Sequence, residues 1–450
     1  CVPSCIPFLD HEPVPRASYF TNQAQQTTGH DARNFANRMT DSKSFQMWYP
    51  QRSLVNTSFE ESSKADYSAP QGQNVCVAIL SLQGCEEDAI LVSKAAVERG
   101  LFRCTEYNVK TFLTADRNKK VFAHPQRAAG EFNVCDKPEW AALDPNTGIA
   151  RVGKRVRTGD AIVGLADSKR VKTVNHGAAL PAVVDRVLIF DEHASGHRTA
   201  KVRLRTDRPL ALGDKLASRF SQKGITSKLV SAEDLPWLED GSGAIDIIVN
   251  PCFLPSRMTI GQLMEHLCGF ACSVLGMPRY DASAFAHSTL SVMKDLEAKG
   301  FKGNAKWLRC PITGERLPNK VEIGIAKYHR LNKFASDKMR VRTTGKTDLI
   351  SNQPCAGRNA GEKALRVGGM ETTALASHGG AFMLNDASRD RSDGTTFNVC
   401  SKCGNTHFLR ESACPLCGSE PTEIQSTTST LRMLQIFDSM NIGMELRTKK

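Results

Sequence analysis

The chain has 450 residues, 40% hydrophobic and 24% charged, an ordinary composition for a folded protein with a large buried core. Lys and Arg total 59 against 47 Asp and Glu, and the formal net charge of +12 favours a polyanionic partner such as nucleic acid. A solvated surface that happens to be cationic explains the charge as well. No uncharged apolar run reaches the roughly 18–20 residues of a membrane span, so no membrane partner is expected.

In chain order, about sixty polar, irregular residues come first, and their turn formers predict an extended path over a surface. Because Cys1 replaces an initial Met, we expect a fragment, a processed product or one piece of a split subunit. An apolar strand is predicted at residues 75–82, and residues 86–99 suit a short helix or an extended element. Short β-like runs separated by glycines then predict a β-rich insertion at about 105–207.

A basic stretch bounded by glycines, residues 213–224, leads to a predicted buried strand at 245–250. Prolines then precede a predicted helix at about 260–276. A second basic segment spans 333–346, and the last predicted helix lies at about 429–440. The pattern of short strands and few long helices indicates a mixed α/β chain.

Of the 15 cysteines, four form one cluster near the end and the rest are scattered singly. Several of the single ones, such as Cys76, Cys268 and Cys272, lie in apolar contexts typical of reduced core residues in an intracellular protein. The nucleus, the cytoplasm and a virion remain open as locations.

The cluster consists of two CxxC motifs, Cys400 with Cys403 and Cys414 with Cys417, each followed by glycine. This spacing predicts a tetrahedral Zn²⁺ site, because two short knuckles bring four thiolates together. Since every ligand position is filled by sulfur, the zinc is expected to be structural. The alternatives are chance spacing and a redox pair, and a zinc ribbon alone indicates no activity.

Several longer motifs carry a resemblance to a known family. They are GQN (72–74), EED (86–88), ERGLF (98–102), GDKLASRFSQKG (213–224), DIIVNP (246–251), PSRMTIGQ (255–262), Gly357-Arg358, RVGGME (366–371) and His378-Gly379. Their content and order resemble the carboxy-terminal half of the second-largest subunit of multisubunit DNA-directed RNA polymerases. The terminal cysteine cluster is similar to the archaeal, eukaryotic and large-DNA-virus type.

The resemblance implies a multidomain, mixed α/β fold. Its core would be a hybrid-binding region of the double-psi β-barrel type at residues 1–104 and 208–355. A wall-like (flap-like) insertion would occupy 105–207. An anchor and clamp segment would follow at 356–450 and contain the zinc ribbon at 400–417.

The resemblance also implies template-dependent synthesis of RNA from NTPs within a complex. The catalytic Mg²⁺ would be held mainly by the largest subunit, so this chain alone is expected to be inactive. The implied partners are the largest and other polymerase subunits, template DNA, nascent RNA and NTPs. Two other interpretations remain: a non-catalytic architectural or zinc-ribbon nucleic-acid-binding protein, and an RNA-templated polymerase.

By resemblance, six residues would approach the RNA 3′ end, the incoming nucleotide and its metal: Lys215, Lys223, Arg257, Arg16, Glu87 and Asp88. Cationic side chains suit phosphate oxygens, and carboxylates can hold Mg²⁺ through water. The plainer alternatives are solvated loop lysines, surface or helix-terminal arginines, and a solvated acidic helix start.

Contacts with nucleic acid are implied for Gln26, Lys338, Arg340, Arg342, Arg358 and Arg366. The basic residues at 338, 340 and 342 alternate along an expected extended segment, so their side chains would share one face. A plain charged surface is the alternative. The chain departs from the family at Phe220-Ser221, where His-Gly is usual, and at Gln25, where lysine is common.

Overall fold

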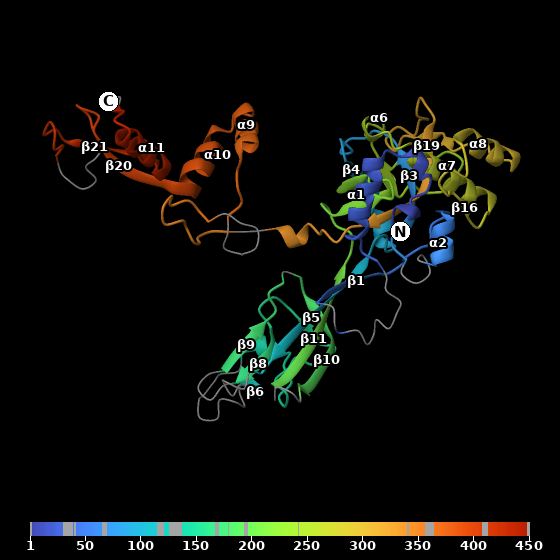
Figure 1. Cartoon of the computed structure of the whole chain (residues 1–450), viewed down its shortest axis with the longest axis horizontal. Helices are drawn as coiled ribbons and strands as arrows, with labels where there is room; N and C mark the ends of the chain where they lie inside the picture. Colours follow the sequence, from blue (N-terminus) through green and yellow to red (C-terminus); the bar gives the residue numbers. More distant parts are fainter. Residues whose placement is uncertain are drawn as a thin grey trace. The chain divides into compact units, whose positions relative to one another are not determined.

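The structure is a computed structural model, and the chain folds as two compact units, Cys1–Lys338 and Met339–Lys450 (Figure 1). It describes residues 2–29, 39, 42–64, 70–114, 121–125, 137–166, 171–178, 180–192, 197–241, 243–339, 342–355, 364–406 and 413–447. Among these described residues, no helix combines the length and the apolar character needed to cross a membrane.

A closed ring of strands forms the centre of the first unit. Its strands are β3 (Gln73–Ile79), β4 (Ala89–Ser93), β12 (Lys215–Ser218), β13 (Lys223–Val230), β15 (Ile247–Val249) and β19 (Val321–Arg330). They are hydrogen-bonded in the order β12-β13-β4-β15-β3-β19, and β12 also pairs with β19, which closes a barrel. The β13–β4 and β15–β3 pairs are parallel and the others are antiparallel. A short strand, β17 (Ala305–Lys306), pairs with the beginning of β19 and is not part of the closed ring.

Strands β4 and β15 are buried on both faces, which explains their continuous apolar sequence, whereas β13 leaves one face exposed. Along β3, Val75 and Val77 belong to one core, whereas Cys76 and Ala78 belong to a second. Helix α7 (Ile260–Leu275) contributes to the second core. It approaches β19 so closely that a Cβ on Gly269 would lie 2.0 Å from the Ile325 carbonyl oxygen. Glycine is therefore required at this crossing.

Short helices and strand pairs complete the first unit. The helices are η1 (Pro3–Cys5), η2 (Leu9–His11), α1 (Val14–Ala24), α2 (Ser58–Ser63), α4 (Lys94–Glu98), η5 (Pro138–Trp140), η6 (Ala232–Asp234), α6 (Phe253–Arg257), α8 (Thr289–Ala298) and η7 (Ser336–Lys338). Two small pairs join β14 (Trp237–Leu238) to β18 (Leu308–Arg309) and β2 (Val55–Asn56) to β16 (Tyr280–Asp281).

A second, antiparallel sheet occupies much of the region predicted to be a β-rich insertion. Its order is β1 (Lys43–Met47), β5 (Cys104–Leu113), β11 (His197–Arg208), β10 (Ala182–Glu192) and β7 (Arg155–Val156). The long strands β5, β10 and β11 lie side by side in Figure 1. A three-stranded sheet of β6 (Val121–Phe122), β8 (Ala161–Ala166) and β9 (Val171–Asn175) shares a separate hydrophobic core with it.

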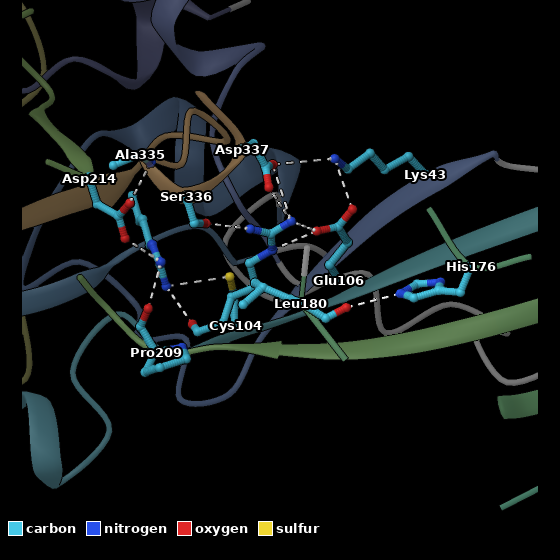
Figure 2. Close-up of polar contacts among 12 residues, drawn as sticks. Lys43, Cys104, Glu106, His176, Leu180, Pro209, Asp214, Ala335, Ser336 and Asp337 are labelled. Atoms are coloured by element: carbon cyan, nitrogen blue, oxygen red, sulfur yellow. Dashed lines mark hydrogen bonds and ion pairs between the residues drawn. The ribbon is translucent and has the colours of Figure 1, made fainter. Parts of the chain in front are cut away.

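A network of buried charges joins this second sheet to the barrel (Figure 2). Arg208, at the end of β11, donates from Nε to Glu106 Oε2 at 2.6 Å and from Nη1 to Ser336 Oγ at 3.0 Å. Arg330, at the end of β19, is 1% exposed and donates from Nη2 to Asp214 Oδ2 at 2.6 Å. It also donates to three backbone carbonyl oxygens, those of residues 102, 208 and 209. These bonds satisfy charges that would otherwise be destabilising in the interior.

The second unit contains helices, one hairpin and the cysteine cluster. In order they are α9 (Gly369–Ser377), α10 (Ala381–Asn385), the π-helical turn η8 (Asp386–Asp393), β20 (Gly394–Cys400), β21 (Pro421–Thr427) and α11 (Thr428–Ser439). β20 and β21 pair in an antiparallel hairpin. The Thr427 hydroxyl accepts a hydrogen bond from the Thr430 amide and caps α11.

The strands predicted at 75–82 and 245–250 and the helices predicted at 260–276 and 429–440 are confirmed within a few residues. The prediction of an extended surface path for the first sixty residues was wrong. This segment contains α1, and its Ile6, Phe8 and Phe20 are buried. Residues 86–99 form a turn, then β4 and α4, because the apolar run is buried on the barrel.

The buried Arg330–Asp214 pair gives a stability prediction. Asp214→Ala leaves a buried guanidinium without its counter-charge, so we expect the free energy of unfolding to fall by about 3–5 kcal/mol. Asp191→Ala is the matched control, since Asp191 pairs with Arg198 at 3.1 Å and both side chains are more than half exposed. The control substitution should change the free energy of unfolding by less than about 1 kcal/mol. Urea-induced unfolding of the purified chain measures both, and equal effects would contradict this account.

Candidate functional site

An open hollow at the rim of the barrel brings together four of the residues predicted from the sequence. Its lining comes from β4 and the turn before it, the start of β13, the end of β15, α6, and single residues of α7 and β19. The lining residues are Glu87, Asp88, Ala89, Ile90, Gln222, Lys223, Gly224, Val249, Asn250, Phe253, Arg257, Gln262 and Tyr328. Acidic, basic and amide side chains thus converge over an apolar floor.

The acidic pair lies in a tight turn that leads into β4. Glu87 has a left-handed backbone with φ of 49°, and the Asp88 carbonyl oxygen accepts a hydrogen bond from the Ile225 amide at 3.1 Å. This bond ties the turn to β13. The alternative of a solvated helix start does not apply, because a strand follows and not a helix.

The two lysines lie on the β12–β13 hairpin and not on a loop. Lys215 is opposite Ile225 and Lys223 is opposite Ala217, so both lysines project from the same face as diagonal neighbours. Partial burial, followed by repulsion from Lys223 and other nearby lysines, lowers the pKa of Lys215. The hairpin therefore concentrates positive charge and favours an anion beside it.

Close approach of β13 to the acidic turn requires Gly224. A Cβ at this position would lie 2.5 Å from the Ile90 side chain and 2.6 Å from the Asp88 carbonyl oxygen. A larger residue would push the strand that carries Lys223 away from the acids.

Arg257 ends α6 and connects the acidic and basic parts of the hollow. Its Nη2 pairs with Asp88 Oδ1 at 2.5 Å, and its Nη1 donates to Gln222 Oε1 at 2.5 Å. Met258 follows with a φ of 54°, which ends the short helix. The guanidinium is held at the hollow with its side chain 22% exposed.

Arg16 lies in helix α1 and Gln26 lies in the turn just after it, and neither residue lines the hollow. The Arg16 guanidinium lies 5.8 Å from the centre of the Tyr19 ring. It also acts on Glu12, whose pKa is raised to about 8 by burial, although the Gly261 and Gln262 amides and Arg16 lower it. The Gln26 carbonyl oxygen accepts from the Asn332 amide at 2.8 Å.

The departure at Phe220-Ser221 is accommodated by packing against α1. Phe220 is 1% exposed and packs with Ile6 and Phe20. Ser221 keeps a left-handed backbone with φ of 60°, and its Oγ accepts from Gln23 Nε2 at 2.9 Å. The turn before Lys223 is thereby attached to the helix that carries Arg16.

The remaining basic residues are not gathered at the hollow. Lys338 ends the 3-10 helix η7, so the expected extended segment with alternating side chains is wrong at this position. Arg340 and Arg358 lie outside the described residues. Arg342 donates to the Lys346 carbonyl oxygen at 3.0 Å, and Arg366 precedes α9; both belong to the second unit.

Sequence reasoning missed Gln222 and Thr259 as site residues. Gln222 stands directly before Lys223 in a quoted motif, which was a usable signal. Its partner Thr259 is 37 positions away, so no local pattern connects them.

The four clustered cysteines meet at the loop end of the β20–β21 hairpin, and their sulfur atoms all lie within 4.8 Å of one another. The Cys400–Cys417 and Cys403–Cys414 sulfur pairs are 3.3 and 3.5 Å apart. Sulfur ligands at the usual zinc distance lie about 3.8 Å from each other, so the four residues fit a tetrahedral ion after a small expansion.

Local hydrogen bonds favour thiolates in the cluster. The Ser419 hydroxyl and amide lower the pKa of the Cys417 thiol to about 6. The Cys403 amide lowers the pKa of the Cys400 thiol. The Asn405 amide lowers the pKa of Cys403, but burial and contact with the other three sulfurs outweigh it and raise the value to about 12. A bound cation would remove this conflict between neighbouring thiolates.

The fold and the two sites together define a mixed α/β, sheet-rich protein with a hollow lined by charged side chains and a cluster of four cysteines that could hold a zinc ion. Two family profiles match the chain: RNA polymerase Rpb2, domain 6, over residues 2–360, and RNA polymerase Rpb2, domain 7, over residues 364–449. The chain belongs to the Rpb2 family of RNA polymerase subunits, which confirms the resemblance found in the motifs.

Individual relatives agree with the family. The archaeal DNA-directed RNA polymerase subunit Rpo2 of Saccharolobus shibatae is 31% identical over 98% of this chain and 40% of its own length. DNA-directed RNA polymerase I subunit RPA2 of Homo sapiens is 34% identical over 89% of this chain and 35% of its own. Subunit 2 of Acanthamoeba polyphaga mimivirus is 33% identical over 100% of this chain and 39% of its own. The chain thus spans about two fifths of these relatives.

The cysteine geometry predicts that the chain binds one equivalent of zinc through the cluster. Cys414→Ser should reduce bound zinc to a small fraction, because a hydroxyl is a poor substitute for a thiolate ligand. Elemental analysis of the purified protein measures this. Cys310→Ser is the matched control, since Cys310 begins a similar turn in which Gly314 donates to its carbonyl oxygen, but it has no partner thiols in the cluster. Zinc retained in Cys414→Ser would contradict the assignment.

Proposed function

We propose that this chain is part of a DNA-directed RNA polymerase and that its barrel hollow binds the phosphates of the incoming NTP. The observation that carries the proposal is the convergence of Lys223, Arg257, Glu87 and Asp88 on one hollow in a chain of this family. The partners would be the largest and other polymerase subunits, template DNA and nascent RNA. Because the catalytic Mg²⁺ would be held mainly by the largest subunit, activity is expected only in the assembled complex.

The chemistry of the hollow suits transfer of a nucleotidyl group. Such a reaction depends on positioning and on neutralising phosphate charge more than on covalent help. Arg257 can bind phosphate oxygens in a bidentate manner, and Lys223 adds a mobile point charge beside it. Lys215, on the same face of the hairpin, extends the positive surface toward a neighbouring phosphate.

Glu87 and Asp88 fit a supporting role toward Mg²⁺. Both line the hollow, the Asp88 side chain is 44% exposed, and carboxylate oxygens are the ligands that Mg²⁺ prefers. When bound, Mg²⁺ would neutralise phosphate charge and orient the leaving group. These residues would orient the metal's water ligands, while the main metal ligands would come from the largest subunit.

The architecture supports the predicted assignment of the segments. A closed barrel with two parallel strand pairs supports a double-psi β-barrel-type hybrid-binding core at 1–104 and 208–355. The antiparallel sheet with its own hydrophobic core supports a wall-like insertion at 105–207. The hairpin with four cysteines supports a structural zinc ribbon at 400–417 within an anchor and clamp segment at 356–450.

Lysine and arginine variants in the assembled polymerase test this function. Lys223→Ala and Arg257→Ala should each slow nucleotide addition by about ten- to a hundredfold, because each removes a charged contact to phosphate. Lys228→Ala is the control: Lys228 is exposed on the same strand but does not line the hollow. Rapid-quench measurement of single-nucleotide addition on a DNA–RNA scaffold gives the rates.

Assembly must be monitored in the same preparations. If both hollow variants add nucleotides at the normal rate while zinc-ligand variants lose assembly, the chain is an architectural or zinc-ribbon binding subunit and the proposed role of the hollow fails.

A further inference from the structure

A buried amide at the edge of the hollow has both of its ends engaged. Gln222 lies between β12 and β13 and is 7% exposed. Its Nε2 donates to Thr259 Oγ1 at 2.9 Å, and its Oε1 accepts from Arg257 Nη1 at 2.5 Å. The side chain therefore bridges the arginine of the hollow to the beginning of α7.

The direction of this amide follows from chemistry. An arginine side chain has only hydrogen-bond donors, so the oxygen of Gln222 must face Arg257. The NH₂ group then faces Thr259, whose hydroxyl oxygen must accept. Without that hydroxyl, a buried N–H group would lose its partner and the amide would lose its anchor.

Thr259 is unusual among the helix-capping threonines of the chain. It occupies the N-cap of α7, but its hydroxyl makes no capping hydrogen bond. By contrast, the Thr57 and Thr427 hydroxyls accept from the first turns of α2 and α11. Thr259 is also 0% exposed, so its hydroxyl serves Gln222 and not the helix end.

The Arg257 guanidinium thus has one neutral buried partner and one charged partner that is more exposed. Asp88, at 44% exposure, holds Nη2, and such exposed ion pairs contribute little net free energy. Phosphate oxygens can therefore take the place of the Asp88 carboxylate. The Gln222 carbonyl group carries no charge, so it orients the guanidinium without neutralising it.

We propose that Gln222, oriented by Thr259, is a positioning residue that aims Arg257 at the NTP phosphates while Asp88 gives up its ion pair. The released Asp88 carboxylate is then available to the water shell of Mg²⁺. This inference rests on the proposed function of the hollow. It adds two residues, Gln222 and Thr259, that act through Arg257 and not by touching the reacting atoms.

The test is single-nucleotide addition by the assembled polymerase over a range of NTP concentrations. Thr259→Val and Gln222→Met each break the Thr259–Gln222–Arg257 hydrogen-bond relay. KM for NTP should therefore rise about tenfold while kcat changes by less than about threefold. Thr259→Ser keeps the accepting hydroxyl and should restore KM to nearly the wild-type value. Thr57→Val is the matched control, because it removes a buried capping hydroxyl whose hydrogen-bond partners are the Glu60 amide and the Ser4 carbonyl oxygen. Its KM should remain unchanged.

A charged variant sharpens the test. Gln222→Glu places a carboxylate against Arg257 and removes the donor to Thr259, so it should raise KM more than Gln222→Met. The reason is that the new carboxylate competes with phosphate for the guanidinium.

The outcomes separate this inference from the proposed function. If the wild-type complex makes RNA and Arg257→Ala impairs it, but Thr259→Val and Gln222→Met keep the wild-type KM, only the positioning role is overturned. The positioning role alone is also overturned if Thr259→Val and Thr57→Val lower kcat equally and leave KM unchanged. If Arg257→Ala behaves as wild type, the proposed function of the hollow is overturned, and the positioning role of Gln222 is overturned with it.

Discussion

Strand β12 hydrogen-bonds to β13 along one edge and to β19 along the other. This double pairing is what closes the barrel. The same pairing places Leu216 opposite Arg330. From there the Arg330 side chain reaches Asp214, the residue just before β12, inside the protein. The strand pairing that closes the barrel and the buried Arg330–Asp214 ion pair therefore form at the same place. A strand of four residues is thereby fixed along both edges and at its beginning.

This closure determines where the functional charges lie. With β12 fixed, the β12–β13 hairpin projects Lys215 and Lys223 from one face, and Gly224 lets β13 approach the turn that carries Asp88. Helix α6 adds Arg257 from the far end of β15. Partial burial, together with repulsion from Lys223 and other nearby lysines, lowers the pKa of Lys215. Under the proposed function, the phosphates of the bound NTP would offset this repulsion.

Much of the site could be predicted from the sequence, because its chemistry is concentrated in short motifs. The two CxxC pairs indicated a zinc site without any knowledge of the fold, and the motifs at 213–224 and 255–262 indicated Lys223 and Arg257. Features that depend on distant contacts could not be predicted. Gln222 and Thr259 are joined across 37 residues, and the helix α1 was hidden because its mostly polar sequence buries only Phe20 and Gln23. The position of Lys338 on a 3-10 turn likewise follows from the buried network around Arg208, to which its neighbours Ser336 and Asp337 belong.

The proposed function requires that the hollow at the rim of the barrel receives the triphosphate of the incoming nucleotide. The most direct measurement is a structure of the assembled polymerase on a DNA–RNA scaffold with a non-hydrolysable NTP and Mg²⁺. Our account predicts Arg257 and Lys223 within hydrogen-bonding distance of phosphate oxygens, with the Arg257–Asp88 pair opened. A triphosphate bound elsewhere, with that ion pair intact, would contradict it.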